Sequence, residues 1–118
     1  MVKLIYVITR KAGMPVAEFQ RYWRETHGPI AARIPGLRRY VQCHTLPELY
    51  DRDPPPAYDG AAELWFDDVV SMREAMVSPE VAAAREDERN FIDHSRVLAI
   101  VTEEKVVVEE LGAGQGGA

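Results

Sequence analysis

Apolar and polar residues alternate along this chain with two different periods, and their order predicts its secondary structure. Segments with the period of a strand, rich in β-branched and aromatic residues, cover residues 2–9, 37–45, 60–66 and 96–102, the last with an alternative extension over 106–108. Segments with the period of a helix lie between the first two strands and between the last two. The pattern therefore predicts strand-helix-strand twice in succession.

The first helical segment has a well-defined apolar face. Residues spaced by three or four positions lie on the same face of a helix. The inward face of this segment consists of residues with that spacing, namely Phe19, Trp23, His27, Ile30 and Ile34. Pro15 suits the first helical position, and Gly28-Pro29 is expected to end the helix at about His27, before a short second turn. His27 is therefore expected to face the interior of the protein.

The second helical segment begins after Asp67 or Asp68, either of which can cap its first turn. Ser78-Pro79 restarts the helix, which continues to about Glu88. Between the second and third strands, residues 46–59 include three consecutive prolines and are predicted to form a long loop.

This order of elements predicts a ferredoxin-like βαββαβ domain of the α+β class, with a four-stranded antiparallel sheet and both helices on one face. We expect the domain to span residues 1–111 and the glycine-rich segment 112–118 to be disordered. One face of such a sheet lacks a cover, although apolar residues are available to both faces, among them Ile5, Val7, Leu64 and Ile100. The sheet is therefore expected to pack against a second copy of the chain, as a homodimer.

Composition narrows the possible functions. The 118 residues suffice for one domain, and no apolar run approaches the ~20 residues that span a bilayer. Because no signal peptide precedes the first strand, we expect a cytoplasmic protein with no membrane partner.

Cys43 is the only cysteine, which excludes an intrachain disulfide. The three histidines have no metal-ligand spacing, so no metal site is predicted. The sequence also contains no nucleotide-binding fingerprint.

The net charge of −5 argues against nucleic-acid binding, but this charge is unevenly distributed. Residues 1–50 contain eight Lys and Arg against three Asp and Glu, whereas residues 51–118 contain six against sixteen. The asymmetry is compatible with an anionic ligand near the first half, with complementary packing between subunits, and with a solvated surface.

Polar side chains on inward faces are the candidates for chemistry. Imidazole changes its charge near neutral pH, so an inward His27 is either a packed core residue or an acid–base group. Tyr40 shares a strand face with Arg38 and His44, where a phenol can orient a substrate carbonyl, donate a proton, or pack in the core. Only one of Arg38 and Arg39 can face a pocket there, where its guanidinium would bind a carboxylate.

The run F-x-x-Y-W-x-x-T-H-G-P, present as Phe19–Pro29, resembles the signature of the EthD family. Three later segments agree with this resemblance: DGAAELWFDD at 59–68, Ser-Pro-Glu at 78–80 and NFIDHSR at 90–96. The similarity covers residues 1–105. It implies membership of the dimeric α+β barrel superfamily, in which two ferredoxin-like subunits join their sheets.

The resemblance also implies a chemistry, namely proton transfer next to a carbonyl or phenol without metal or organic cofactor. The implied substrate is a small lactone, quinone or aromatic polyketide-like compound, and the implied reaction is isomerisation or dehydration. In methylmuconolactone isomerase-like members, the histidine of the helix motif and a tyrosine of the next strand are implicated, which correspond to His27 and Tyr40 as catalytic residues. The expected substrate-binding residues are Tyr6, Trp23, Arg38, His44 and His94.

Besides a barrel with a collapsed pocket and no small-molecule role, two alternatives stay open at the level of sequence. The first is a cofactor-free monooxygenase built on the same barrel. The second is a non-catalytic accessory protein that binds a small molecule for an oxygenase system.

Overall fold

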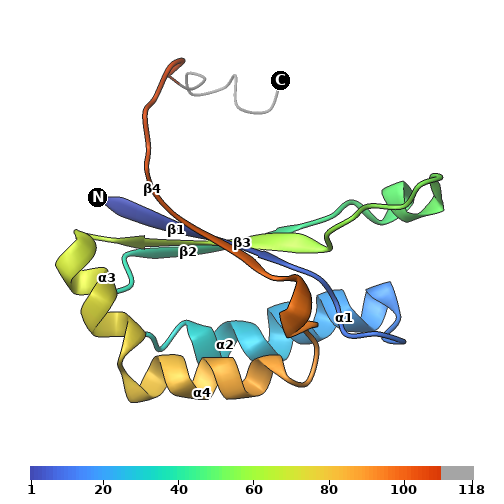
Figure 1. Ribbon diagram of the computed structural model, residues 1–118, viewed down its shortest axis with the longest axis horizontal. Helices are drawn as coiled ribbons and strands as arrows, with labels where there is room; N and C mark the ends of the chain where they lie inside the picture. The colour runs from blue at the N-terminus through green and yellow to red at the C-terminus, as the bar shows by residue number, and fades with distance from the viewer. Residues whose placement is uncertain (110–118) are drawn as a thin grey trace.

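The computed structural model describes residues 1–109, which form a four-stranded antiparallel sheet with helices on one of its faces (Figure 1). The strands are β1 (Val2–Ile8), β2 (Arg39–His44), β3 (Gly60–Phe66) and β4 (Leu98–Glu103), in the order β2-β3-β1-β4. β1 is central, since its Leu4 lies opposite Leu64 of β3 and Val101 of β4. The α+β class and the ferredoxin-like topology are thus confirmed, whereas the predicted disordered segment 112–118 lies outside the described residues.

The helical layer comes from the two connections that the sequence predicted. The first contains α1 (Val16–Tyr22), a π-helical turn η1 (Trp23–His27) and α2 (Gly28–Ala31). The second contains α3 (Val69–Met76) and α4 (Pro79–Glu88). Two 3-10 turns, η2 (Pro47–Asp51) and η3 (His94–Arg96), lie in the loops. No helix within residues 1–109 is long and apolar enough to cross a lipid bilayer.

The first helix does not end at Gly28-Pro29 as predicted, but passes through the π turn and continues to Ala31. In an α-helix a proline lacks the N–H that bonds four residues back, and its ring collides with that carbonyl. Here Gly28 donates its N–H to the carbonyl of Trp23, five residues back, and the wider turn accommodates Pro29. Gly28 keeps helical backbone angles before a proline because it has no Cβ to clash with the ring.

Side-chain caps begin the helices of the second connection. Asp68, rather than Asp67, caps α3, because its carboxylate accepts the N–H of Ser71 at 2.8 Å. The hydroxyl oxygen of Ser78 accepts the N–H of Val81 at 3.1 Å and so caps α4. Both caps lie where the sequence predicted a helix to begin.

Strand ends differ by a few residues from the prediction. β4 begins at Leu98 rather than at residue 96, because η3 occupies the preceding positions and is capped by Asp93, which accepts the N–H of Ser95 at 3.0 Å. The alternative extension over 106–108 is wrong, since no strand forms there.

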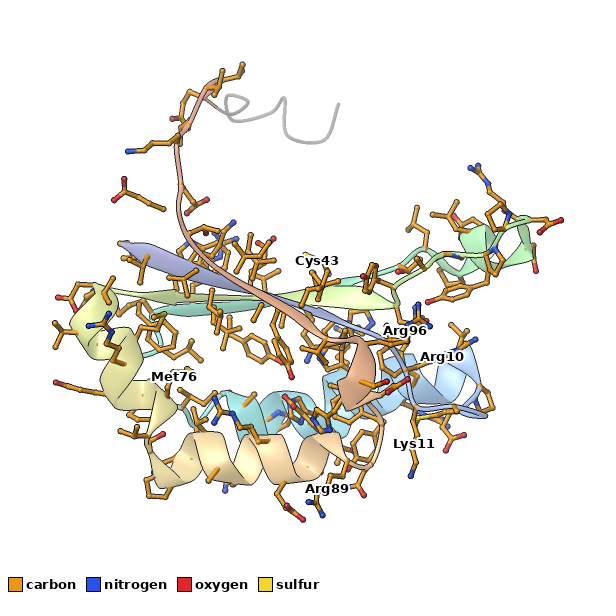
Figure 2. The ribbon with its side chains drawn as sticks, viewed as in Figure 1. Arg10, Lys11, Cys43, Met76, Arg89 and Arg96 are labelled. Atoms are coloured by element: carbon orange, nitrogen blue, oxygen red, sulfur yellow. The ribbon has the colours of Figure 1, made fainter. Side chains whose placement is uncertain are left out.

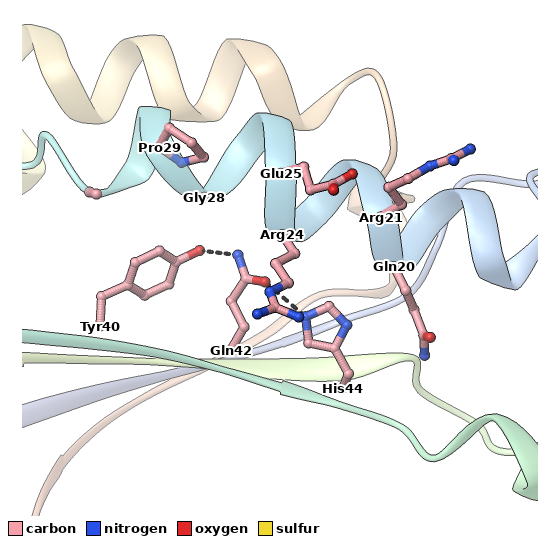
Figure 3. A pocket seen from close by; sticks show the side chains of 10 residues that line it. Gln20, Arg21, Arg24, Glu25, Gly28, Pro29, Tyr40, Gln42 and His44 are labelled. Atoms are coloured by element: carbon pink, nitrogen blue, oxygen red, sulfur yellow. Dashed lines mark hydrogen bonds between the residues drawn. The ribbon is translucent and has the colours of Figure 1, made fainter.

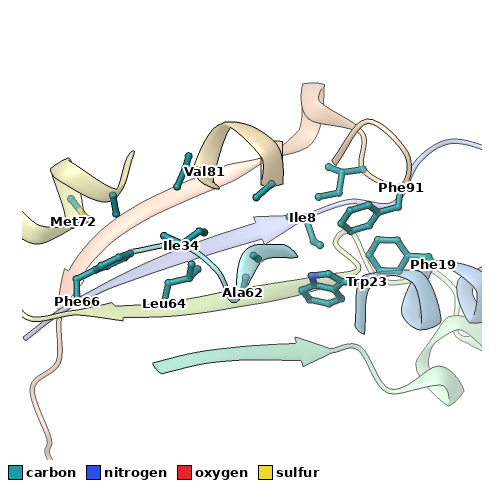
Figure 4. Packing of buried hydrophobic residues seen from close by; sticks show 14 residues of the cluster. Ile8, Phe19, Trp23, Ile34, Ala62, Leu64, Phe66, Met72, Val81 and Phe91 are labelled. Atoms are coloured by element: carbon teal, nitrogen blue, oxygen red, sulfur yellow. The ribbon is translucent and has the colours of Figure 1, made fainter. Parts of the chain in front are cut away.

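The two faces of the sheet differ in their cover. Toward the helices, the largest fully buried side chains are Ile8, Phe19, Trp23, Phe66 and Phe91 (Figure 4). On the opposite face Leu98 and Ile100 are 48% and 53% exposed, and Cys43 is exposed as well (Figure 2). Residues 104–109, after β4, rise away from the helices on this side (Figure 1). Within residues 1–109, no helix covers the face that carries these side chains.

Trp23 lies where the π turn meets the sheet. Its indole packs against Phe19, with ring centroids 5.7 Å apart, and stacks on His44 at 4.3 Å. It also contacts the backbone of β3: a Cβ atom at Gly60 would lie 2.5 Å from Cζ3 of Trp23 and 2.6 Å from the carbonyl oxygen of Cys43. The absence of a side chain at Gly60 therefore determines how closely the indole approaches the sheet.

We expect Gly60→Ala to lower the free energy of unfolding by about 2 kcal/mol, because overpacking a tight site costs roughly 1–3 kcal/mol. Ala61→Gly is the matched control. It changes one methyl group at the next position of β3, on the other face of the sheet, and should cost at most about 1 kcal/mol. Urea denaturation at one protein concentration measures both variants. A Gly60→Ala protein as stable as the wild type would contradict the close packing of Trp23.

Candidate active site

A cavity of about 100 Å³ lies between the sheet and the helices. β1, β2 and β3 contribute one wall, and the first helical connection and α4 contribute much of the other. Most of the lining is apolar, but it includes titratable side chains, among them Tyr6, His27, Tyr40 and Glu88. Because so small a space holds few water molecules, electrostatic interactions inside it are screened weakly.

His27 is buried at the end of the π turn, and its ring centroid lies 4.7 Å from that of Phe91. Its Nδ1 lies 2.8 Å from Oδ2 of Asp87 on α4. Tyr22 donates its hydroxyl hydrogen to Oδ1 of the same carboxylate at 2.6 Å, and Asn90 donates to that oxygen at 3.2 Å. Burial acts to raise the pKa of Asp87, but these three hydrogen bonds outweigh it and lower the pKa.

The ionised Asp87 fixes the position of the proton on neutral His27. An ionised carboxylate only accepts hydrogen bonds, so Nδ1 carries the hydrogen and the imidazole lone pair is on Nε2. Within residues 1–109, Nε2 has no hydrogen-bond partner, and the ring lines the cavity. His27 can therefore take a proton from a molecule in the cavity, while Asp87 stabilises the imidazolium that forms.

A second set of hydrogen bonds runs along β2 (Figure 3). The amide of Gln42 donates from Nε2 to the backbone carbonyl of Trp23 at 2.9 Å and to the hydroxyl oxygen of Tyr40 at 2.7 Å. A carbonyl oxygen only accepts, so the orientation of the amide is fixed. Its Oε1 then accepts from Nε2 of His44 at 2.8 Å, which places the hydrogen of neutral His44 on Nε2.

This arrangement leaves the hydrogen of the Tyr40 phenol available. The oxygen of Tyr40 accepts from Gln42, so its own hydrogen can be donated to a molecule in the cavity. Burial raises the pKa of Tyr40, which keeps the phenol protonated at neutral pH. Burial also lowers the pKa of His44, and the positive charge of Arg24 lowers it further, so His44 is neutral there. Tyr40 can thus donate a hydrogen bond inside the cavity that His27 also lines.

Tyr40 also lines a second, open hollow of about 990 Å³, here called the groove (Figure 3). The groove lies between β2 and the first helical connection, and its lining includes Gln20, Arg24, Gly28, Gln42 and His44. Because the cavity and the groove share Tyr40, a molecule bound in the groove would lie next to the wall of the cavity.

On the side of the cavity away from β2, Glu88 receives two hydrogen bonds on Oε1. The Tyr6 hydroxyl donates at 3.0 Å, and Nε2 of His94 lies 2.8 Å from the same oxygen. Glu88 is buried because it continues the inward stripe of α4 formed by Val81 and Ala84. Burial, followed by the charge of Glu88, raises the pKa of Tyr6. His94 is exposed, so it connects this buried carboxylate with solvent.

The structure distributes the predicted site residues over several places. Those that line the cavity are Tyr6, Trp23, His27 and Tyr40. His44 lies in the groove, and His94 bonds Glu88 from outside the cavity lining. Arg38 lines neither space: it precedes β2, is exposed, and pairs with Asp67 at 3.2 Å. The roles assigned to these residues stay predictions.

Sequence reasoning missed the two carboxylates of α4. Glu88 had a signal, because it follows Val81 and Ala84 at spacings of three and four and so continues an inward helical stripe. Asp87 had none, since it lies in a run of charged residues and meets His27 only through the packing of two distant segments.

In the part of the chain that the structure describes, no three His, Cys, Asp or Glu side chains are grouped to hold a metal ion. The carboxylates of Asp87 and Glu88 are occupied by hydrogen bonds from neighbouring side chains. That the reaction needs no cofactor stays a prediction.

The fold and the site define a ferredoxin-like protein with a histidine–carboxylate pair between its sheet and its helices. A family model described as the EthD domain matches residues 11–95, and the chain belongs to the EthD family. The chain is 30% identical over 93 residues to an uncharacterized 11.0 kDa protein in the thcB-thcC intergenic region of Rhodococcus erythropolis. That match covers 77% of this chain and 85% of the relative.

Solved structures resemble this one over nearly their whole length. An EthD family protein from Bacillus halodurans has a TM-score of 0.72 and 25% identity, covering 89% of this chain and 99% of that one. A dimeric ferredoxin-like protein of unknown function from Bacteroides fragilis has a TM-score of 0.64 and 16% identity, covering 87% and 95%. SnoaB, a cofactor-independent oxygenase from Streptomyces nogalater, has a TM-score of 0.63 and 18% identity, covering 92% and 97%. The last two matches establish a shared fold only.

We expect neutral His27 and neutral His44 to be opposite tautomers, with the hydrogen on Nδ1 in His27 and on Nε2 in His44. Long-range ¹H–¹⁵N correlation spectra at pH 8 distinguish the two forms. Asp87→Asn should remove the tautomer preference of His27 and leave that of His44, whereas Gln42→Leu should do the reverse. The same tautomer at both histidines in the wild type would show that the hydrogen bonds are oriented otherwise.

Proposed function

We propose that this protein is a cofactor-independent enzyme that moves a proton on a small lactone, quinone or aromatic polyketide-like compound, in an isomerisation or a dehydration. The pairing of His27 with ionised Asp87 at 2.8 Å carries the proposal, because it leaves Nε2 of His27 as a base beside the cavity. Tyr40 supports it, as a buried phenol in the same cavity with an unused hydrogen.

In this reaction Nε2 of His27 takes a proton from the carbon next to a carbonyl group. Tyr40 donates a hydrogen bond to the carbonyl oxygen, where negative charge accumulates as the enolate forms. The imidazolium then returns the proton, either to another carbon of the conjugated system or to a departing hydroxyl group. The first outcome is an isomerisation and the second is a dehydration. Neither changes the oxidation state of the substrate overall, so proton transfer alone suffices.

The dimensions of the two hollows indicate how a substrate would be placed. Pockets for small molecules have volumes of about 300–1,000 Å³. The cavity has about 100 Å³ and admits only a small part of a substrate, whereas the adjoining groove has about 990 Å³. We therefore place the reacting atoms in the cavity and the remainder of the substrate in the groove, on either side of Tyr40.

A cofactor-free monooxygenase is the second candidate. The fold is shared with SnoaB, which is described as a cofactor-independent oxygenase. In such a reaction the same His27–Asp87 pair would deprotonate a phenol, and the electron-rich phenolate would react with dioxygen. One oxygen atom would bond to the ring and the other would leave as water, while the ring itself is oxidised to a quinone. A non-catalytic binding protein for an oxygenase system is the third reading, and it differs from the first two only in the absence of turnover.

We further infer that two copies of the chain pair through the uncovered face of the sheet, in the manner of a dimeric α+β barrel. Leu98 and Ile100 are exposed on this face, and Ile5 of the central strand lies opposite Ile100. Removing such apolar surface from water stabilises association by roughly 25 cal/mol per Å². The similarity to a ferredoxin-like protein described as dimeric supports the formation of a dimer.

We expect wild-type protein to exchange the hydrogen next to the carbonyl of an unsaturated lactone with solvent deuterium, with muconolactone as the first probe and proton NMR as the readout. His27→Gln should slow this exchange ~10²–10⁴-fold and leave the Kd of the probe unchanged, since a general base acts on the rate. Tyr40→Phe should also slow it.

Tyr50→Phe is the matched control for Tyr40→Phe, because Tyr50 bonds Asp59 in the loop before β3, away from the cavity lining. It should keep the wild-type rate. Binding of lactones, quinones and phenols without any exchange or oxygen uptake would contradict an enzymatic function and favour the accessory protein.

We expect Ile100→Glu to weaken dimerisation roughly 100-fold, because it places a charge in an apolar interface. Val77→Glu is the matched control, since Val77 is 85% exposed between α3 and α4 on the helical side. Sedimentation equilibrium measures the dimer dissociation constant of each variant. Equal effects of the two substitutions, or a monomeric wild type, would refute pairing through the sheet.

A further inference from the structure

The groove contains a positive charge that the described part of the chain does not neutralise. Arg24 of the π turn lines the groove, and within residues 1–109 its side chain forms no ion pair and no hydrogen bond. Figure 3 shows its guanidinium reaching across the groove toward Gln42 and His44 of β2. An arginine that crosses a hollow without a protein acceptor is placed to bind an acceptor on a ligand.

The neighbouring charges do not cancel that of Arg24. Arg21 and Glu25 also border the groove, but their side chains extend along the helix rather than toward β2 (Figure 3). On the opposite wall His44 is neutral at pH 7, and the charge of Arg24 contributes to the lowering of its pKa. The space between Arg24 and β2 therefore has a net positive charge.

The Gln42 amide on the β2 wall is fully occupied by hydrogen bonds within the protein. The amide of Gln42 uses both its N–H groups and its oxygen in hydrogen bonds to Trp23, Tyr40 and His44. The available donors at the junction are the N–H groups of Arg24 and the hydroxyl of Tyr40. Two donors of this kind match two oxygen groups on one molecule, a carboxylate for the guanidinium and a carbonyl for the phenol.

We propose that the groove is a carboxylate-binding site and that the substrate is a small organic acid, with its carboxylate on Arg24 and its reacting carbonyl at Tyr40. This inference rests on the proposed function for the reacting end of the substrate. It adds the substrate class, because Arg24 selects molecules with an anionic group a few bonds from the carbonyl. It also assigns the carboxylate contact to Arg24 rather than to Arg38, which is paired with Asp67.

The test compares an acid with its uncharged analogue, using 2-naphthoate and 2-naphthamide as the probes. Isothermal titration calorimetry should show that wild-type protein binds 2-naphthoate at least ~10-fold more tightly than 2-naphthamide, in line with the strength of hydrogen bonds to charged groups. Arg24→Gln should raise the Kd for 2-naphthoate at least ~10-fold and leave the Kd for 2-naphthamide unchanged.

Arg33→Gln is the matched control, because it removes the same charge from an exposed residue just beyond α2 that lines neither the cavity nor the groove. It should change the Kd for 2-naphthoate less than 2-fold. As a second readout, NMR titration of His44 should show its pKa rise in Arg24→Gln and in wild-type protein saturated with 2-naphthoate. A structural effect of the substitution alone would not produce the rise with ligand.

Equal affinity for the acid and the amide, no binding of 2-naphthoate, or an unchanged Kd in Arg24→Gln would each overturn the carboxylate site. These results are distinguishable from failure of the proposed function. If the protein binds the acid through Arg24 but His27→Gln changes no reaction rate, the site is retained and the acid–base role is lost. If the exchange reaction depends on His27 but the acid is not preferred, the reverse holds.

Discussion

The carbonyl oxygen of Trp23 is the constraint on which the β2 side of the site depends. In the π turn this oxygen accepts a hydrogen bond from the N–H of Gly28. The same oxygen accepts a second hydrogen bond from the Gln42 amide. Because a carbonyl cannot donate, the Gln42 amide has one orientation, and that orientation assigns the hydrogens of Tyr40 and His44. A backbone irregularity therefore controls the protonation pattern of side chains on a different element, which is consistent with the frequent occurrence of π turns at functional sites.

The α4 side of the site is arranged in a complementary way. Asp87 and Glu88 are consecutive residues, yet each carboxylate collects hydrogen bonds from a different set of donors. Asp87 is hydrogen-bonded to Nδ1 of His27, and Glu88 is hydrogen-bonded to Tyr6 and to the exposed His94. Both carboxylates are buried or nearly so, and burying a polar or charged group is costly unless hydrogen bonds replace its contacts with water. The donors thus account for the position of two acidic residues against the core.

The sequence allowed most of the fold to be predicted, because its periods of two and 3.6 residues persist over whole elements. The inward position of His27 followed from its spacing to Trp23, and the structure buries both. The continuation of the helix through Gly28-Pro29 was not predictable from residue preferences, since it depends on a single shifted hydrogen bond. Side-chain contacts between segments that are distant in the sequence could not be predicted either. No pattern in the sequence indicates that His27 contacts Asp87.

The uneven charge of the chain has a structural counterpart in this arrangement. The positively charged first half contributes the hydrogen-bond donors of the site, including the guanidinium of Arg24 and the phenol of Tyr40. The negatively charged second half contributes the carboxylates of Asp87 and Glu88, which are saturated by protein donors. On one side a ligand therefore meets hydrogen-bond donors that the protein does not use. On the other side the carboxylates of Asp87 and Glu88 are already hydrogen-bonded within the protein. This asymmetry favours an acceptor-rich ligand, and in the proposed reaction one base, Nε2 of His27, acts on a molecule that is held by its oxygens.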